Sequence, residues 1–160
     1  MRVAFYHIVT IFVVLLSSSC TLLPKGIAIE GVVWAESYGA EENLVRAKVA
    51  VRNDSDKSVT LQSGEISVRI GGQKLTTLNL AQSVEIPPVG ATEIETQWVM
   101  SHDDPATIYV MSRHPIERYM ERITVDFSLA IERAGKVKIL SRRGVKGGRI
   151  DMNFENLLRK

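Results

Sequence analysis

Two short polar clusters contain residue types that could do chemistry. In His102-Asp103-Asp104, an imidazole stands beside two carboxylates, a combination in which a histidine works as a general base with an acidic group to orient it. The competing interpretation is that one of these carboxylates caps a helix beginning at Pro105, while the histidine is a solvated loop residue. We favour the cap. Separately, no serine lies in a Gly-x-Ser-x-Gly turn, so an α/β-hydrolase site has no support. The sequence therefore predicts a protein that is not an enzyme, with a hydrolase as the least favoured function.

The second cluster, Asn53-Asp54-Ser55-Asp56, could bring alternate side-chain oxygens to one calcium ion. It lacks the glycine and the distal glutamate of an EF-hand loop, so a plain turn is the favoured interpretation. Cys20 is the only cysteine, and no two histidines have the spacing of a metal pair on a helix. The run Gly144-Val145-Lys146-Gly147-Gly148-Arg149 lacks the Gly-Lys-Ser/Thr ending of a phosphate-binding loop and is expected to be a hairpin loop. We expect no metal ion and no cofactor.

Charge is divided unevenly along the chain. Residues 20–132 carry ten Lys and Arg against sixteen Asp and Glu, whereas residues 133–160 carry nine against two. The candidate residues for binding an anionic surface lie in this basic segment, at Arg142, Arg143, Lys146 and Arg149. Anionic headgroups or acidic glycans are the expected targets, at ~1 kcal/mol per Lys or Arg held near a charged surface. The alternative is a solvated basic face that only aids solubility.

The N-terminal residues predict export. Arg2 precedes an apolar segment, Val3 to Leu16, which is too short to span a bilayer and is followed by small residues, as in a secretory signal peptide. The run Leu15-Leu16-Ser17-Ser18-Ser19-Cys20 resembles a bacterial lipobox. The resemblance implies that residues 1–19 are a lipoprotein signal peptide and that Cys20 carries a diacylglycerol thioether and an amide-linked acyl chain. An ordinary cleaved signal with an incidental cysteine is the alternative.

A lipid on Cys20 would hold the chain at a membrane through a short tether, residues 20–26. The six residues after the cysteine reach at most ~20 Å when extended, so the folded part would lie close to the bilayer. Export also argues against a nucleic-acid partner. We expect a location in the cell envelope, at the outer membrane facing the periplasm, because Thr21 stands where some bacteria place the aspartate that retains lipoproteins at the inner membrane. The inner membrane is the alternative.

The rest of the chain alternates apolar and polar residues with the period of half-buried strands. Gly71-Gly72 indicates a two-residue hairpin, and a short helix is expected from Pro105 to about Ser112. Strands are expected at residues 27–34, 44–51, 59–61 and 66–70 with a bulge permitted by Gly64 between them, 75–86 with an interruption near Leu80, 91–100, 123–131, 136–140 and 150–154.

This rhythm of short strands predicts an all-β fold. We expect an antiparallel immunoglobulin- or fibronectin-III-like β-sandwich of seven to eight strands with one short helix. The sandwich domain would span residues 27–155, and residues 156–160 would form a C-terminal tail. With a single cysteine the domain has no internal disulfide, so its stability must come from core packing and backbone pairing.

The order of these features is similar to the late-embryogenesis-abundant type 2 family, also called the water-stress and hypersensitive-response (WHy) domain. The resemblance is carried by Val45 to Val51 with Arg52-Asn53-Asp54, by Ser63 to Leu75, by Glu85 to Ile94, by the short helix, and by Ile123 to Ile131. It covers roughly residues 30 to 140. It implies a non-catalytic immunoglobulin-like sandwich, linked in the family to stress protection and in some members to membrane or lipid association.

These observations give one leading hypothesis and two others. The first is a lipid-anchored envelope protein that acts as a membrane-surface binding or stress-protective module. The second is an accessory subunit of an envelope complex, which would use a sheet edge to pair with another chain. The third is a lipid carrier, which would need an apolar cavity within the β-structure.

Overall fold

The computed structural model describes residues 25–38, 43–111, 113–115 and 118–146. The signal peptide, Cys20, Arg149, the expected strand at residues 150–154 and the C-terminal tail lie outside these residues. The strands are β1 (Ile27–Tyr38), β2 (Leu44–Asn53), β3 (Val59–Ile70), β4 (Gln73–Leu80), β5 (Val84–Ile86), β6 (Gly90–His102), β7 (Ile123–Arg133) and β8 (Lys136–Lys146), and the helix is α2 (Pro105–Met111).

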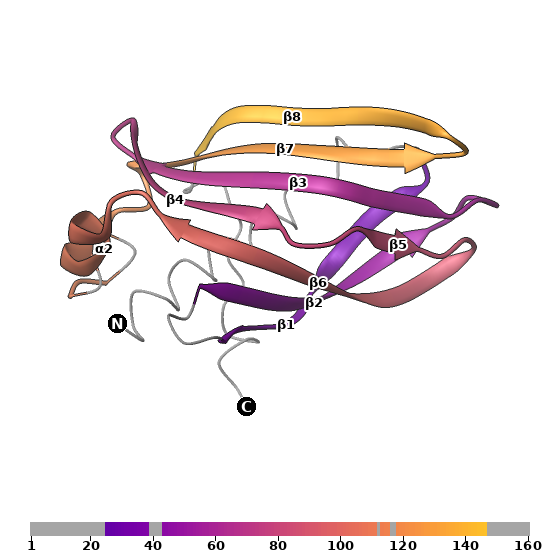
Figure 1. Ribbon diagram of the computed structural model, residues 1–160, viewed down its shortest axis with the longest axis horizontal. Helices are drawn as coiled ribbons and strands as arrows, with labels where there is room; N and C mark the ends of the chain where they lie inside the picture. The colour runs from indigo at the N-terminus through magenta and orange to yellow at the C-terminus, as the bar shows by residue number, and fades with distance from the viewer. Residues whose placement is uncertain (1–24, 39–42, 112, 116–117, 147–160) are drawn as a thin grey trace.

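All strand pairs are antiparallel and belong to one curled sheet (Figure 1). The order is β1-β2-β6-β4-β3-β7-β8, with β5 also paired to β3, so β1 and β8 are the edges of the described sheet. The sheet curls until Ile27 and Ile29 of β1 share an apolar pocket with Leu129 and Ile131 of β7. The expectation of an antiparallel β fold with one short helix is confirmed. The expected immunoglobulin-like topology of two sheets is not confirmed, because the hydrogen-bonded ladder is continuous.

Alternation along the strands predicts correctly which side chains form the core. In β2, Val45, Ala47, Val49 and Val51 are buried while the residues between them are half-buried or exposed, and β7 repeats this pattern from Ile123 to Ile131. Two predicted boundaries were wrong. The strand expected at residues 136–140 continues as β8 to Lys146, where a glycine-rich loop was expected, and the strand expected at residues 27–34 continues as β1 to Tyr38. The segments 59–61 and 66–70, expected on either side of a bulge, form the single strand β3. A β-bulge allows β3 and β8 each to continue through irregular residues.

The turns are set by residues that accept positive φ angles. Gly71 and Gly72, with φ of 55° and 88°, join β3 to β4 as a primed hairpin turn. The interruption after Leu80 is also confirmed, since β4 ends there. Figure 1 shows that this hairpin and α2 lie at one end of the sheet, and that the β7–β8 turn lies at the other.

Gly64 lies in β3 directly over the largest core side chain. Trp98 is 1% exposed, and its indole N–H donates to Thr96 Oγ1 at 3.0 Å. A Cβ on Gly64 would lie 3.0 Å from both Leu129 Cδ2 and Trp98 Cη2. The bulge that Gly64 was expected to permit is adjacent, between Leu61 and Ser63. The glycine therefore serves close packing against the indole ring.

We expect Gly64→Ala to lower the free energy of unfolding by about 1–3 kcal/mol, because the added methyl group overpacks the core against Trp98. Urea denaturation followed by tryptophan fluorescence measures this change. Ser63→Ala, at the neighbouring exposed position, is the control and should stay within about 0.5 kcal/mol of the wild type. Equal stability of the two variants would contradict the prediction, because it would show that the core around Trp98 accommodates the methyl group without cost.

Candidate functional site

The basic candidate residues lie on β8, at the edge of the sheet. Arg142, Arg143 and Lys146 are exposed, and Arg149 lies outside the described residues. The register pairs Arg142 with the core residue Phe127, which places Arg142 at the rim of the inner face. The expected cluster is therefore not a single flat patch.

A bulge changes the alternation of β8 near its end. Val145 pairs with the buried Val125, so Arg143 and Gly144 together face the single residue Asp126 on the outer side of β7. Gly144 has a φ of 66°, a value that favours glycine. Bulges bend an edge strand and redirect its side chains. This bulge places Arg143 and Gly144 together beside Asp126 and returns Val145 to the inner face.

A polar groove of about 420 Å³ lies on the outer side of the sheet at this point and reaches the β8 edge, where Arg142 joins its lining. We call it the β8 groove. Its lining includes Ser67 and Arg69 of β3, Lys74 of β4, Asp126 of β7, and Arg142 and Arg143 of β8. Its volume falls in the ~300–1,000 Å³ range of small-molecule sites, although its lining is far more polar than usual.

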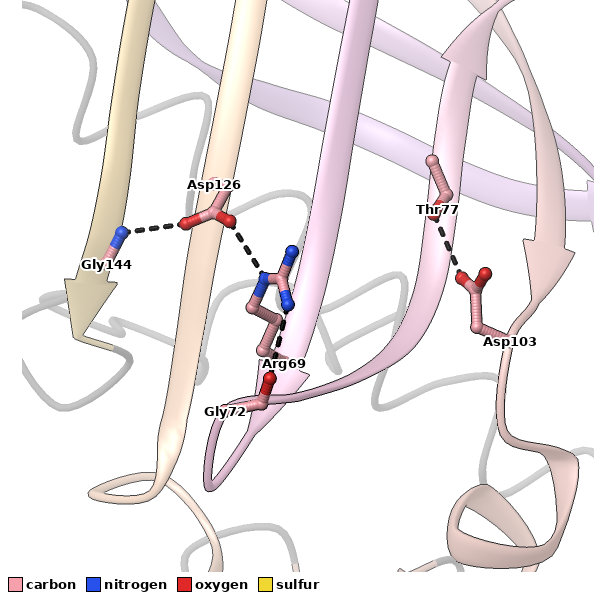
Figure 2. Close-up of polar contacts among 6 residues, drawn as sticks. All are labelled: Arg69, Gly72, Thr77, Asp103, Asp126 and Gly144. Carbon is pink, nitrogen blue, oxygen red and sulfur yellow. Dashed lines mark hydrogen bonds and ion pairs between the residues drawn. The ribbon is translucent and has the colours of Figure 1, made fainter.

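One ion pair fixes the floor of the β8 groove (Figure 2). The Nε–H of Arg69 donates to Asp126 Oδ2 at 2.9 Å, and an Nη1–H of the same guanidinium donates to the carbonyl oxygen of Gly72 at 3.2 Å. The other oxygen of Asp126 accepts the backbone N–H of Gly144 at 2.8 Å. These contacts join β3, β7 and the β8 bulge, so the groove has a fixed shape along one side.

Asp126 is held in its ionised form. Burial acts to raise the pKa of its carboxyl group, but the Gly144 N–H and the Arg69 guanidinium outweigh burial, and Arg143 adds to them. The pKa therefore lies below the ordinary aspartate value. The Arg69 guanidinium offsets the negative charge of this carboxylate within the groove.

We expect the ion pair at Asp126 to make stability fall in acid. A pKa lowered by folding gives a contribution that is complete above the unfolded-state pKa and is lost as pH falls through the folded-state value. Asp126→Asn should therefore cost about 1–2 kcal/mol at neutral pH and flatten the acid limb of the stability curve. Urea titrations between neutral and strongly acidic pH measure both effects.

Asp56→Asn, at an exposed turn position, is the matched control and should preserve the acid limb. An acid limb that is unchanged in Asp126→Asn would contradict the assignment.

The His102 cluster is arranged for structure. Asp103 Oδ2 accepts the Thr77 hydroxyl at 3.0 Å (Figure 2), and Asp104 Oδ1 accepts the backbone N–H of Thr107 at 3.1 Å. Burial lowers the pKa of His102, and the Asp103 carboxylate only partly opposes this. Within the described residues, neither carboxylate is hydrogen-bonded to His102. The predicted helix cap is confirmed at Asp104, and His102 is exposed as the last residue of β6 rather than in a loop.

Asn53 organises the turn that the sequence placed at residues 53–56. It is fully buried, and its Nδ2 donates to the carbonyl oxygens of Lys57 and Pro87, each at 3.0 Å. Its Oδ1 accepts both the backbone N–H and the hydroxyl of Ser55. The turn interpretation is confirmed, and no group of three or more His, Cys, Asp or Glu among the described residues is placed to hold a metal ion.

The chain enters the sheet at the end opposite the β8 groove. Arg133 Nη1 donates to the carbonyl oxygen of Lys25 at 3.0 Å, and Asp54 N–H donates to that of Gly26 at 2.7 Å. Arg133 ends β7, whereas Asp126 lies near its start, about 23 Å away at ~3.3 Å per residue. Lys25 and the groove therefore lie near different ends of the same strand.

A second cavity is apolar and small. It lies inside the curl near the start of β1, is lined by side chains such as Ile27, Val59 and Ile86, and has a volume of about 50 Å³. An engineered cavity of ~150 Å³ holds a single benzene molecule. The described cavity therefore has no room for an acyl chain, and the lipid-carrier hypothesis gains no support from it. Among the described helices, none is long and apolar enough to cross a bilayer.

The sequence did not point to Ser67, Arg69 or Lys74 as parts of a site. Arg69 and Ser67 alternate with core residues of β3, which indicates only a solvent-facing side. The Gly71-Gly72 hairpin was the one available signal, because it brings β4 back beside β3 and so places Lys74 near Arg69.

Comparisons with known proteins assign no family. No family model matches the chain, and no curated protein matches it. One similar solved structure is a protein from Archaeoglobus fulgidus, with 14% identity over 73% of this chain and 94% of that chain and a TM-score of 0.46. Another is a Northeast Structural Genomics Consortium target, with 13% identity over 81% of this chain and 94% of that chain and a TM-score of 0.39.

Proposed function

We propose that this chain is a non-catalytic lipoprotein of the cell envelope, anchored through Cys20, that acts as a membrane-surface binding or stress-protective module. We further propose that its curled sheet is a variant of the late-embryogenesis-abundant type 2 sandwich. The observation that carries the surface-binding function is the charge of β8. This edge strand presents five exposed cations and no acidic residue: Lys136, Lys138, Arg142, Arg143 and Lys146.

The geometry favours a domain that lies on its side at the bilayer. The contact between Lys25 and Arg133 fixes where the tether leaves the sheet, beside the β7–β8 turn. Cations more than ~8 Å from the headgroups are screened. If β8 stood perpendicular to the bilayer, the cations at its far end would therefore not attract the headgroups. A tether of ~20 Å allows the domain to lie down. All five cations then reach the surface, each worth ~1 kcal/mol.

Flotation with anionic vesicles tests the proposal, using the unacylated mature chain, residues 20–160. Changing Arg142, Arg143, Lys146 and Arg149 to glutamine should weaken vesicle binding at least a hundredfold, because about four contacts of ~1 kcal/mol are lost. The control changes four exposed cations outside β8, Lys57, Arg113, Arg118 and Arg122, and should weaken binding less than tenfold. Equal losses, or no flotation of the wild type, would contradict the proposal.

Pairing of the β8 edge with another chain is the second candidate function. Val137 and Ile139, which are 55% and 69% exposed, would support strand addition on the outer face. Lys138 pairs with the core residue Ile131 and so lies at the inner rim, where a charge discourages edge-to-edge pairing. Crosslinking that captures a partner through β8, and loses it in Ile139→Lys, would favour this alternative.

A further inference from the structure

We infer that the β8 groove is a binding site for the phosphate group of an anionic phospholipid headgroup. The inference rests on the proposed function and goes beyond it by naming the site and the ligand chemistry. The groove has more positive than negative side chains in its lining. Four cations, Arg69, Lys74, Arg142 and Arg143, face two carboxylates, Glu65 and Asp126.

The excess positive charge is available to a ligand. Arg69 is the cation that pairs with Asp126, and this pair is further satisfied by backbone groups of Gly72 and Gly144. Within the part of the chain that the structure describes, Lys74 and Arg142 make no ion pair or side-chain hydrogen bond. Arg143 only adds to the field at Asp126. The Lys74 ammonium group and the Arg143 guanidinium group therefore line the groove without a fixed anion, and Arg142 adds a second such guanidinium group at the sheet edge.

Hydroxyl groups complete the lining. Ser67 is 4% exposed and lies at the floor on β3, while Ser128 and Ser141 face each other across β7 and β8. A phosphate group accepts hydrogen bonds from guanidinium, ammonium and hydroxyl donors together, and arginine suits it through its planar pairs of N–H groups. An apolar ligand would find little complementary surface here, and a metal cation would be repelled.

The position of the groove suits a lipid headgroup. It is bordered by β8, the strand that faces the bilayer in the proposed orientation, and both Arg142 and Arg143 of this strand belong to its lining. With β8 against the bilayer, a headgroup phosphate could enter the groove from the β8 edge. The same five cations would attract the bilayer, and the groove would hold one headgroup.

The test uses the unacylated mature chain, residues 20–160, with two probes. The first is sn-glycerol 3-phosphate, followed by amide shifts of Ser67, Ser128 and Gly144, and the second is phosphatidylglycerol vesicles in a neutral lipid background. Lys74→Gln and Arg143→Gln remove cations that line the groove. Lys138→Gln and Lys146→Gln remove cations of β8 outside its lining and serve as controls. Thermal unfolding verifies that each variant is folded.

We expect each groove variant to weaken binding of both probes about tenfold, the size of one charged contact, and each control to change binding of the soluble probe less than twofold. Vesicle binding that all four variants weaken equally, without binding of the soluble probe, would overturn the inference and leave the proposed function standing. Groove-specific binding of glycerol phosphate without vesicle binding would overturn the lipid source, and the proposed membrane function with it.

Discussion

The substitution Asn53→Asp is expected to lower the free energy of unfolding by about 3–5 kcal/mol, because it places an uncompensated charge in the core. The Asn53 amide donates to the carbonyl oxygens of Lys57, Ile86 and Pro87, and the residue is fully buried. A carboxylate there would place one of its oxygens against these carbonyl oxygens, with no N–H group to donate to them. A domain with a total stability of ~5–15 kcal/mol would lose a large part of it.

Urea denaturation of residues 20–160 measures this cost, and the neighbouring exchange provides a matched control. Asp54→Asn is the opposite substitution at the next residue, whose side chain is exposed. Its free energy of unfolding should stay within about 0.5 kcal/mol of the wild-type value. If Asn53→Asp proved as stable as Asp54→Asn, the amide would not organise the turn between β2 and β3.

The substitution Cys20→Ala is expected to abolish fatty-acid labelling of the protein in cells. The proposed acyl chains attach only through this residue, and each buried methylene contributes ~0.8 kcal/mol of membrane affinity. Growth with an alkyne-bearing fatty acid, followed by capture of the labelled protein, measures the effect. The variant should carry no label above background and should accumulate as the uncleaved precursor.

Ser18→Ala is the control for Cys20→Ala, because it preserves a small residue within the proposed processing motif. It should label like the wild type. Label that persisted in Cys20→Ala would place the lipid elsewhere and would remove the anchor from the proposed function.

Most of the strand content could be predicted because the two faces of the sheet differ in polarity. Val45 to Val51 and Ile123 to Ile131 alternate cleanly, and each became a strand with one buried face. The arrangement of the strands could not be predicted in the same way. Alternation shows which face of a strand is buried, but it does not show whether two buried faces belong to separate sheets or to one sheet that curls.

The candidate site was predictable only where it lies on one segment. The basic residues of β8 are close in sequence, so their charge was evident. Arg69 and Asp126 are far apart in sequence and meet because β3 pairs with β7 over eleven aligned positions, Val59 to Ile70 against Arg133 to Ile123. Lys74 joins them through a hairpin. The groove is thus a product of register and of the Gly144 bulge, neither of which a pattern of residue types specifies.

Mass spectrometry of the mature N-terminal peptide, released from protein purified from its own membranes, tests the central claim most directly. The account predicts a peptide that begins at Cys20 and carries a diacylglycerol thioether with an amide-linked acyl chain. A mature chain that begins elsewhere, with an unmodified cysteine or none, would contradict it.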